Sequence, residues 1–218
     1  SFGIQLAGLT HDQEALFGAK NYRGMQQSLY GNFLFQSILG TTVHKYRTGV
    51  SLQYDNFDEE IDSVSFTREE IVPGAFFEYT FSPSEKLDIV SGIRADIHNS
   101  FELFFTPRLH IRYALTEKTI LRFSGGRGQR TASILAENNA VLASSRQLYI
   151  LGDNSGKPYG LEAETAWNAG INLTQAFRLD YRDGSVSFDL YHTYFTNQVV
   201  IDYDDSPQTI LFYNLEGK

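Results

Sequence analysis

Apolar residues occupy alternate positions over several runs of the chain, and the clearest of these runs lies between Glu85 and Arg130. One alternating set is apolar and consists of Leu87, Ile89, Ile93, Ala95 and Ile97. The set between them carries charges, at Asp88, Arg94 and Asp96. A period of two indicates a β-strand, because successive side chains of a strand point to opposite faces. This part of the chain is therefore predicted to form strands with one apolar face and one charged face.

The following run repeats the pattern, since Arg108, His110 and Arg112 alternate with apolar residues. Those apolar residues are Phe105, Leu109, Ile111 and Tyr113. A soluble β-sandwich buries its apolar face and exposes its polar face to water. A membrane barrel instead turns the apolar face to lipid and the charged face to its lumen. The alternation by itself fits both architectures.

Strand-like runs recur along the whole chain and are bounded by turn residues. They number about ten and cover 2–8, 26–38, 43–56, 68–82, 86–97, 104–114, 118–128, 164–177, 184–198 and 209–217. The shorter connections lie at 39–42, 82–85, 115–117 and 182–184. The longer or more polar ones lie at 9–25, 56–67, 98–103, 129–163 and 199–208. Short turns at one end and long loops at the other are typical of an outer-membrane barrel.

Aromatic residues of the apolar faces lie near both ends of the predicted strands. Those near the short turns are Phe33, Phe35, Tyr79, Phe81, Tyr113 and Phe177. Those near the long loops are Tyr54, Phe105 and Trp167. Membrane barrels carry such aromatic girdles at both lipid interfaces. We therefore predict an all-β fold, an antiparallel transmembrane β-barrel segment whose lumen-facing residues include Arg94, Arg108, Arg112 and Arg122.

Composition removes several other classes of protein. The mean hydropathy is −0.28 and no apolar run approaches the roughly 18 residues of a membrane-spanning helix. The chain has no cysteine, which excludes disulfides and thiolate metal sites. A net charge of −8 argues against binding to nucleic acid. No secretory leader is seen, so we expect the start of an envelope protein to be missing or processed.

Five segments resemble, in order and spacing, the barrel of TonB-dependent outer-membrane receptors. They are 106–113 with 119–130 (TPRLHIRY and TILRFSGGRGQR), 164–170, 189–200 and 212–217. The similarity is closest to the Bacteroidetes-like siderophore and cobalamin receptors and covers nearly all of residues 1–218. It implies a barrel of 22 strands, closed by an N-terminal plug domain. This sequence contains no plug and no energy-coupling box, so we expect a fragment of one longer barrel domain.

The resemblance also implies a function. It indicates a receptor in the bacterial outer membrane that binds an extracellular ligand, such as a ferric siderophore or cobalamin, and imports it without covalent chemistry or a cofactor. The implied partners are outer-membrane lipid and lipopolysaccharide, that ligand, and the TonB complex acting through the plug. Two alternatives stay open, a self-contained small barrel (adhesin or surface protease) and a soluble β-sandwich binding module. Pairing of strand 2–8 with strand 209–217 would indicate the small barrel.

No catalytic or metal-binding residue is predicted. The histidines have no metal-ligand spacing, and neither HExxH nor GxSxG occurs. The acidic runs 55–62 and 202–205 are interpreted as solvated loops rather than Ca²⁺ sites. The glycines at 125, 126 and 128 are interpreted as relief of crowding on the barrel wall. Asp183 and Gly184 are interpreted as a tight turn.

The segment 129–163 is the longest connection, and long structured loops usually carry function. Thr131 or Ser133 is predicted to cap a short helix with an apolar stripe. That stripe comprises Ile134, Leu135, Val141 and Leu142. Our candidate ligand-binding residues are Arg127, Arg130, Arg146 and Tyr149, because arginine suits carboxylate, catecholate-metal or phosphate groups and tyrosine suits stacking. Alternatively, Arg127 and Arg130 pair with lumen carboxylates or with the plug.

Overall fold

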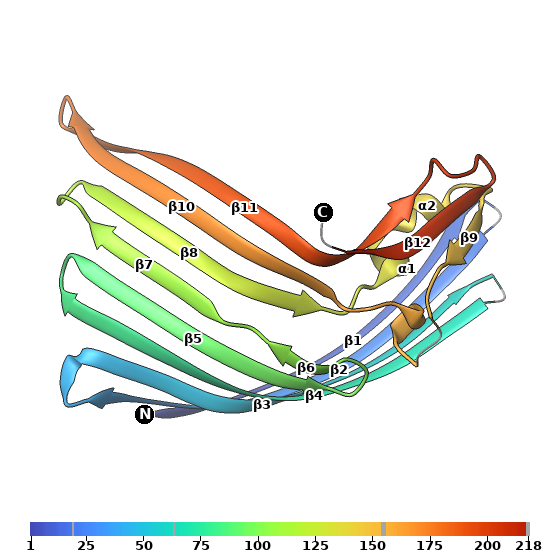
Figure 1. Cartoon of the computed structure of the whole chain (residues 1–218), viewed down its shortest axis with the longest axis horizontal. Coiled ribbons are helices and arrows are strands. Elements are labelled where there is room, and N and C mark those ends of the chain that lie inside the picture. The colour runs from blue at the N-terminus through green and yellow to red at the C-terminus, as the bar shows by residue number, and fades with distance from the viewer. Residues whose placement is uncertain (19, 63, 154–155, 217–218) are drawn as a thin grey trace.

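The computed structural model describes residues 1–18, 20–62, 64–153 and 156–216. In these residues the chain forms one curved sheet of twelve strands (Figure 1). The strands are β1 (Phe2–Phe17), β2 (Lys20–Leu39), β3 (Thr41–Ile61), β4 (Val64–Ser84), β5 (Leu87–His98), β6 (Glu102–Phe105), β7 (Arg108–Ala114), β8 (Thr119–Arg130), β9 (Gln147–Ile150), β10 (Glu164–Leu179), β11 (Arg182–Asp202) and β12 (Thr209–Glu216). Between β8 and β10 lie α1 (Ile134–Glu137), α2 (Asn139–Leu142) and the 3-10 helix η1 (Pro158–Gly160). None of the helices described is long and apolar enough to cross a membrane.

The sheet is an antiparallel meander in chain order, and the short strand β9 adds to β12 in parallel at its end. Both β6 and β7 pair with β5 in one continuous register and are separated at Pro107, which has no N–H for the ladder. Among the described residues β1 pairs only with β2, and β12 pairs with β11 and β9. The sheet therefore does not close on itself, and the pairing expected of a self-contained small barrel is not observed.

The two faces of the sheet differ in chemistry. We call the face covered by segment 131–163 the inner face and the opposite one the outer face. Large apolar residues such as Leu52 and Ile93 are exposed on the outer face, while Ser51 and Asp96 are buried on the inner face. The predicted lumen arginines all lie on the inner face: Arg94 in β5, Arg108 opposite Gly92, and Arg112 opposite Arg122. The predicted division of the strands into one apolar and one charged face is thus confirmed.

The aromatic girdle is also observed. Six of the predicted residues are exposed on the outer face, namely Phe33, Phe35, Phe105, Tyr113, Trp167 and Phe177. The other three, Tyr54, Tyr79 and Phe81, share that face by register and are partly buried against neighbours. An all-β antiparallel sheet with an apolar, aromatic outer face is the fold that the sequence predicted.

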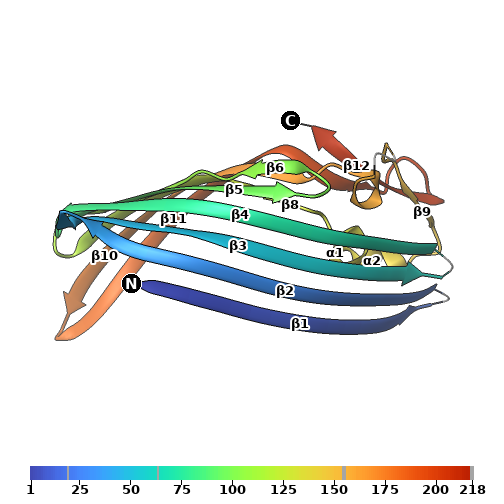
Figure 2. The same ribbon diagram turned by 90° about the horizontal axis from the view of Figure 1, so that it is seen from below.

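The strands extend further at the loop end than predicted. The predicted loop at 9–25 is mostly the continuous hairpin of β1 and β2, and that at 56–67 belongs to β3 and β4 (Figure 2). These strands have 16 to 21 residues, whereas about 9–11 residues cross the hydrocarbon of a bilayer. Toward the loop end apolar and polar residues no longer alternate strictly in β3 and β4, so the ladder continues without a period-two signal in the sequence.

The acidic run 55–62 was wrongly predicted to be a solvated loop. Its residues up to Ile61 lie in β3, and Asp55 and Glu59 are only 4% and 5% exposed on the inner face. The second acidic run is closer to expectation, because Asp204 and Asp205 lie exposed between β11 and β12. Residues 19, 63, 154, 155 and 217, which fall within predicted loops or the last predicted strand, lie outside the described residues.

The turn between β10 and β11 was predicted at the wrong place. It is formed by Asp180 and Tyr181, whose φ angles are +46° and +66°, as a two-residue hairpin turn of type I′ requires. Gly184 instead lies in β11 opposite Phe177, where a Cβ would meet the Phe177 ring at 2.7 Å. Gly126 relieves crowding in the sheet as predicted, because a Cβ there would lie 2.9 Å from the carbonyl oxygen of Pro107.

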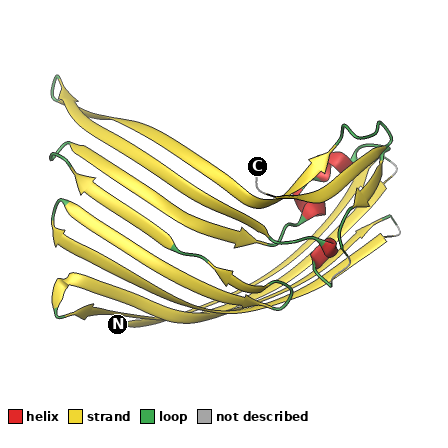
Figure 3. Ribbon diagram, in the orientation of Figure 1, coloured by secondary structure: helices red, strands yellow, loops and turns green. Residues whose placement is uncertain are grey.

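The apolar core lies at the loop end of the sheet rather than along its middle. Segment 131–163 and β12 pack there on the inner face of β2 and β3 (Figure 3). The buried cluster comprises Tyr22, Ile61, Ala132, Ile134, Leu135, Val141, Leu142, Leu161, Ile210 and Phe212. The predicted apolar stripe is therefore buried, although the helix is interrupted at Asn138. Ser133 precedes α1 without capping it through its side chain.

Candidate ligand-binding surface

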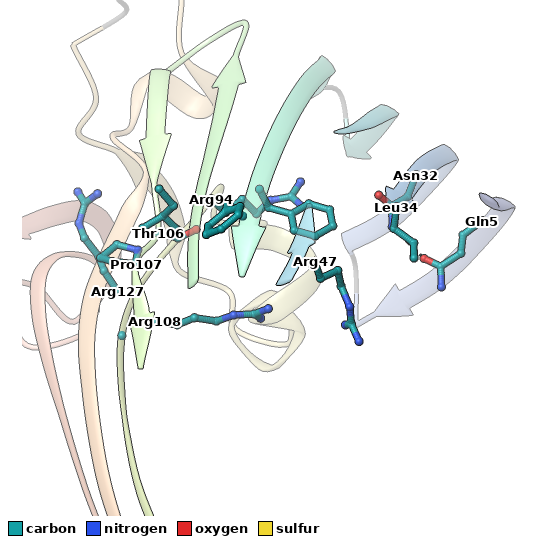
Figure 4. Close-up of a pocket in the computed structure, with 13 residues that line it drawn as sticks. Gln5, Asn32, Leu34, Arg47, Arg94, Thr106, Pro107, Arg108 and Arg127 are labelled. Carbon is teal, nitrogen blue, oxygen red and sulfur yellow. Dashed lines mark hydrogen bonds between the residues drawn. The ribbon is translucent and has the colours of Figure 1, made fainter. Parts of the chain in front are cut away.

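Three arginines of the inner face border one cavity of about 440 Å³. They are Arg47 from β3, Arg94 from β5 and Arg108 from β7. Figure 4 shows Arg47 and Arg108 coming from strands on either side of this cavity. Each lies on the inner face because the alternation of its strand points it there, and Gly92 leaves room for Arg108, since a Cβ at Gly92 would lie 2.9 Å from its Nε. We call this space the arginine cavity.

The charges around the arginine cavity do not balance. The guanidinium of Arg108 donates to Glu78, and the Nη1 atom of Arg47 lies 3.9 Å from the same carboxylate. Arg94 is held more firmly, by two bonds of 2.6 and 2.7 Å to Asp96. Three guanidinium groups thus face two carboxylates. The side chains of Arg47 and Arg108 are about half exposed, so they can turn toward an anionic ligand.

The same cavity holds an amide with unused hydrogen-bonding capacity. Asn32 donates to Gln5 at 3.0 Å, while its buried Oδ1 atom accepts no hydrogen bond. A buried acceptor without a partner costs free energy and is normally satisfied by a ligand or by water. Because this oxygen has no accessible surface, the cavity offers a ligand its positive charge and not this acceptor.

A second polar group on the inner face fastens segment 131–163 to the strands. Arg68 of β4 donates to Ser133 Oγ at 2.6 Å and to the Tyr159 hydroxyl at 3.2 Å. Its Nε atom lies 3.2 Å from Glu70, and its guanidinium lies 3.7 Å from the centre of the Phe57 ring. The side chain of Arg68 is only 9% exposed. We call Arg68 and these contacts the Arg68 network.

Glu59 extends the network to a neighbouring strand. It accepts hydrogen bonds from the hydroxyls of Tyr159 and Tyr22, the latter at 3.1 Å. Burial, together with the Glu59 carboxylate, raises the pKa of Tyr159 well above its ordinary value. The hydroxyl therefore stays protonated and remains a donor to Glu59. Arg68 and His98 both border a further inner-face cavity of about 520 Å³. The Nε2 atom of His98 lies 3.5 Å from Glu70 and 3.4 Å from Thr131 Oγ1.

Arg127 also borders the arginine cavity, but the register of its strand places its side chain on the outer face. It lies opposite Trp167 in the register of β8 and β10. Its guanidinium donates to the carbonyl oxygen of Phe105 at 2.8 Å and to Gln129 at 2.7 Å. Figure 4 shows its side chain pointing away from the other labelled arginines. Its contact with a ligand stays a prediction.

The other three predicted residues are separated as well. Arg130 donates two hydrogen bonds to Glu137 and one to Glu164, so its charge is already compensated. Arg146 donates to the carbonyl oxygen of Tyr203 at 2.9 Å, and Tyr149 to Gln147 at 2.8 Å. In these positions Arg130 and Arg146 join segment 131–163 to neighbouring elements.

Sequence reasoning missed Arg47, although a signal for it was present. Arg47, Ser51 and Asp55 occupy positions of one parity in the predicted strand 43–56, with Val50, Leu52 and Tyr54 on the other. The same rule that placed Arg94 and Arg108 would have placed Arg47. No local sequence pattern predicts the Arg68 network, because Ser133 and Tyr159 lie 65 and 91 positions from Arg68 in the sequence.

Comparison with solved structures gives the same fold. The siderophore receptor PirA from Pseudomonas aeruginosa has a TM-score of 0.61 at 14% identity over 99% of this chain and 42% of that chain. PirA from Acinetobacter baumannii has a TM-score of 0.62 at 11% identity, over 99% of this chain and 40% of that one. A mutant of the ferric enterobactin receptor PfeA from Pseudomonas aeruginosa, in complex with enterobactin, has a TM-score of 0.60 at 13% identity, with coverages of 99% and 40%.

The chain thus spans about two fifths of the length of these receptors. No curated protein sequence matches it significantly. A family model described as "TonB dependent receptor-like, beta-barrel" matches residues 3–218. Since that match covers nearly the whole sequence, and the sheet has the inner and outer faces of a barrel wall, the chain belongs to the family of TonB-dependent receptor β-barrels.

Proposed function

We propose that this chain forms part of the wall of an outer-membrane receptor that binds an extracellular ligand and imports it through a plugged barrel. The remaining strands and the plug would be supplied by the rest of a longer protein. The match of residues 3–218 to the receptor barrel family is the observation that carries the proposal. The open edges at β1 and at the β12 end of the sheet support it, because lipid does not tolerate unpaired strand edges.

The outer face supports an outer-membrane location. Its exposed apolar residues and aromatic girdle match a surface in contact with lipid. The loop end, with segment 131–163, is the extracellular end in this orientation, and the short turns lie in the periplasm. Outer-membrane lipid and lipopolysaccharide are then the surroundings of the barrel, and the TonB complex is the partner that acts through the plug.

The ligand class that fits the arginine cavity is an anionic metal chelate, such as a ferric siderophore. Arg47 and Arg108 share one carboxylate, so the cavity retains positive charge. Guanidinium groups bind carboxylate and catecholate oxygens through paired hydrogen bonds. The solved structures named above include a receptor in complex with enterobactin, which supports this ligand class for the present chain.

The mechanism is binding and passage without covalent chemistry. A ligand arriving from outside first meets segment 131–163 and then the inner-face arginines of β3, β5 and β7. The half-exposed guanidinium groups exchange water and Glu78 for ligand oxygens, and energised movement of the plug then opens the path. Cobalamin, a glycan or a peptide would need few of these arginine charges. Which of these ligands is imported therefore tests the proposed ligand class.

The experiment is uptake by the full-length receptor in a strain that lacks other receptors for iron chelates. Cells are supplied with radiolabelled ferric siderophores or cobalamin, with and without a functional TonB complex. We expect TonB-dependent uptake of a ferric siderophore. A receptor that reaches the outer membrane but takes up only cobalamin, a glycan or a peptide would contradict the ligand class. A receptor that does not fractionate with the outer membrane would contradict the function itself.

A further inference from the structure

His98 closes the turn between β5 and β6 from a buried position. Its side chain is 2% exposed at the end of β5, and the residue pairs in register with Glu102 of β6. The Nδ1 atom of its ring accepts a hydrogen bond from the backbone N–H of Ser100 at 3.1 Å. A backbone N–H can only donate, so Nδ1 carries no proton in this arrangement. The proton of the neutral ring is therefore on Nε2.

The Nε2 side of the ring faces a carboxylate. The Nε2 atom lies 3.5 Å from Oε2 of Glu70 in β4 and 3.4 Å from Thr131 Oγ1. Glu70 is buried as well. Its Oε1 atom lies 3.2 Å from Nε of Arg68 and accepts no hydrogen bond from the residues that the structure describes. This carboxylate therefore has the capacity to bind a second positive charge beside it.

The other groups around His98 also allow its ring to carry a charge. The ring centre lies 4.9 Å from that of Phe101 and 5.3 Å from that of Phe104, distances at which aromatic rings attract cations. Further charged groups of β3, β4, β5 and β8 border the same cavity, namely Asp55, Arg68, Arg94, Asp96 and Arg130. Arg94 is engaged by Asp96, and Arg130 by Glu137 and Glu164. Glu70 is the carboxylate that pairs with His98.

We propose that His98 is a pH-sensitive switch of the turn between β5 and β6, which on protonation releases the backbone of Ser100 and pairs with Glu70. Histidine is the side chain that ordinarily changes its charge between about pH 5 and 8. The second proton adds to Nδ1, where it meets the N–H of Ser100, and two donors cannot share a hydrogen bond. In exchange, the imidazolium gains a charge-assisted contact with Glu70.

The change affects the second half of the turn. Asn99, the first residue of the turn, is held by β4 through neutral groups, since it accepts from the N–H of Ile71 at 3.1 Å and donates to the carbonyl oxygen of Glu69 at 2.7 Å. Ser100 borders a cavity of about 460 Å³ together with residues 157–159. Release of Ser100 in acidic medium therefore loosens one wall of this cavity at the loop end. This regulation does not depend on which ligand the receptor imports.

Hydrogen exchange of the full-length receptor between about pH 5 and 8 tests the proposal, with each rate divided by that of an unstructured chain at the same pH. Mass spectrometry with fragmentation resolves single amides. His98→Asn removes the titratable ring and keeps an acceptor for Ser100, because an asparagine side chain can bond the backbone N–H two residues on. Glu70→Gln removes the carboxylate that attracts the imidazolium. His11→Asn, which changes an exposed histidine of β1, is the control.

We expect protection of the Ser100 amide to fall at least about tenfold from about pH 8 to about pH 5 in the parent protein and in His11→Asn, as for loss of one hydrogen bond. Protection of the Ile71 amide should stay constant. His98→Asn should keep Ser100 protected throughout, and Glu70→Gln should lose the protection only at a lower pH than the parent.

Constant protection of Ser100 in the parent protein, an equal loss in His98→Asn, or a loss at an unchanged pH in Glu70→Gln would each overturn the proposal. A receptor that shows the expected pH dependence but imports nothing would count against the proposed function alone.

Discussion

The Glu78 carboxylate is shared by two arginines, and this sharing leaves the arginine cavity with an excess of positive charge. Its carboxylate accepts from Arg108 and lies 3.9 Å from Arg47. With one acceptor for two donors, part of each guanidinium stays available, in contrast to Arg94, which Asp96 engages through two bonds. At the scale of single residues, the binding strength of the cavity therefore depends on Arg47 and Arg108 more than on Arg94.

We expect Arg47→Gln and Arg108→Gln each to weaken the binding of a ferric catecholate by about tenfold, because each removes a charge-assisted hydrogen bond. Calorimetric titration of the full-length receptor measures the effect. Arg178→Gln is the matched control, since Arg178 is an exposed arginine of β10 beside the short turn to β11, and it does not border the arginine cavity. Unchanged affinity in both cavity variants would remove this cavity from the ligand path.

Among the elements, segment 131–163 is held in two ways. Its apolar residues pack on Tyr22 and Ile61, and the Arg68 network ties Ser133 and Tyr159 to β4. Its strand β9 also pairs in parallel with β12, so the segment contributes to the sheet itself. We expect a connection with this many fixed contacts to behave as a structured part of the sheet's loop end.

We expect Arg68→Met to release segment 131–163. The substitution removes the donor to Ser133 and Tyr159 and leaves Glu70 buried without its arginine, at a cost of about 3–5 kcal/mol. Hydrogen exchange of the full-length receptor should then rise in 131–163 while the middle of β10 stays protected. Arg23→Met, which changes an exposed arginine at the same end of the sheet, should leave the exchange unaltered. Protection that persists in Arg68→Met would show that apolar packing alone holds the segment.

The docking of segment 131–163 should also weaken at alkaline pH. The pKa of Tyr159 is raised when the segment is docked, while an undocked tyrosine ionises near pH 10. Docking is therefore unaffected below about pH 10 and loses up to about 1.4 kcal/mol per pH unit above it, because only the undocked form gives up its proton. Hydrogen exchange between about pH 9 and 11, which brackets the ordinary tyrosine pKa of about 10, measures this loss. Tyr159→Phe should lack this component, and an equal pH dependence in that variant would contradict the assignment.

At the scale of the whole molecule, the sheet has two faces, two ends and two open edges. The outer face is apolar, the inner face carries the charges, and the strands project furthest at the loop end. The orientation proposed above, with 131–163 outside the cell, agrees with these features.

Labelling can test that orientation in a full-length receptor from which any cysteine outside this segment has been removed, because residues 1–218 contain no cysteine. Asp204→Cys lies in the exposed connection between β11 and β12, and Glu117→Cys lies in the exposed turn between β7 and β8. A membrane-impermeant thiol reagent should label the first variant in intact cells. It should label the second only after the outer membrane is opened. The reverse result would invert the proposed topology.

Sequence alone predicted the faces of β5 to β8 well, because lipid on one side and charge on the other impose a strict period of two. The same alternation, continued through Leu121 and Phe123, places Arg127 on the apolar face, and its assignment to the ligand path did not apply that rule. The lengths of β1 and β3 were not predictable in this way, since the strict alternation is lost near the loop end, where Phe17 and Ile61 pack in an apolar core that forms only on folding. The Arg68 network depends on the folding of 131–163 and has no local signal.

The long paired strands at the loop end constrain how this surface can evolve. A one-residue insertion in a ladder such as that of β3 and β4 would transfer every later side chain to the opposite face. Sequence change in these paired strands should therefore arise mainly by substitution, position by position. Gains and losses of whole residues should accumulate instead in the connection between β11 and β12, where the backbone is not bound by a partner strand on both sides.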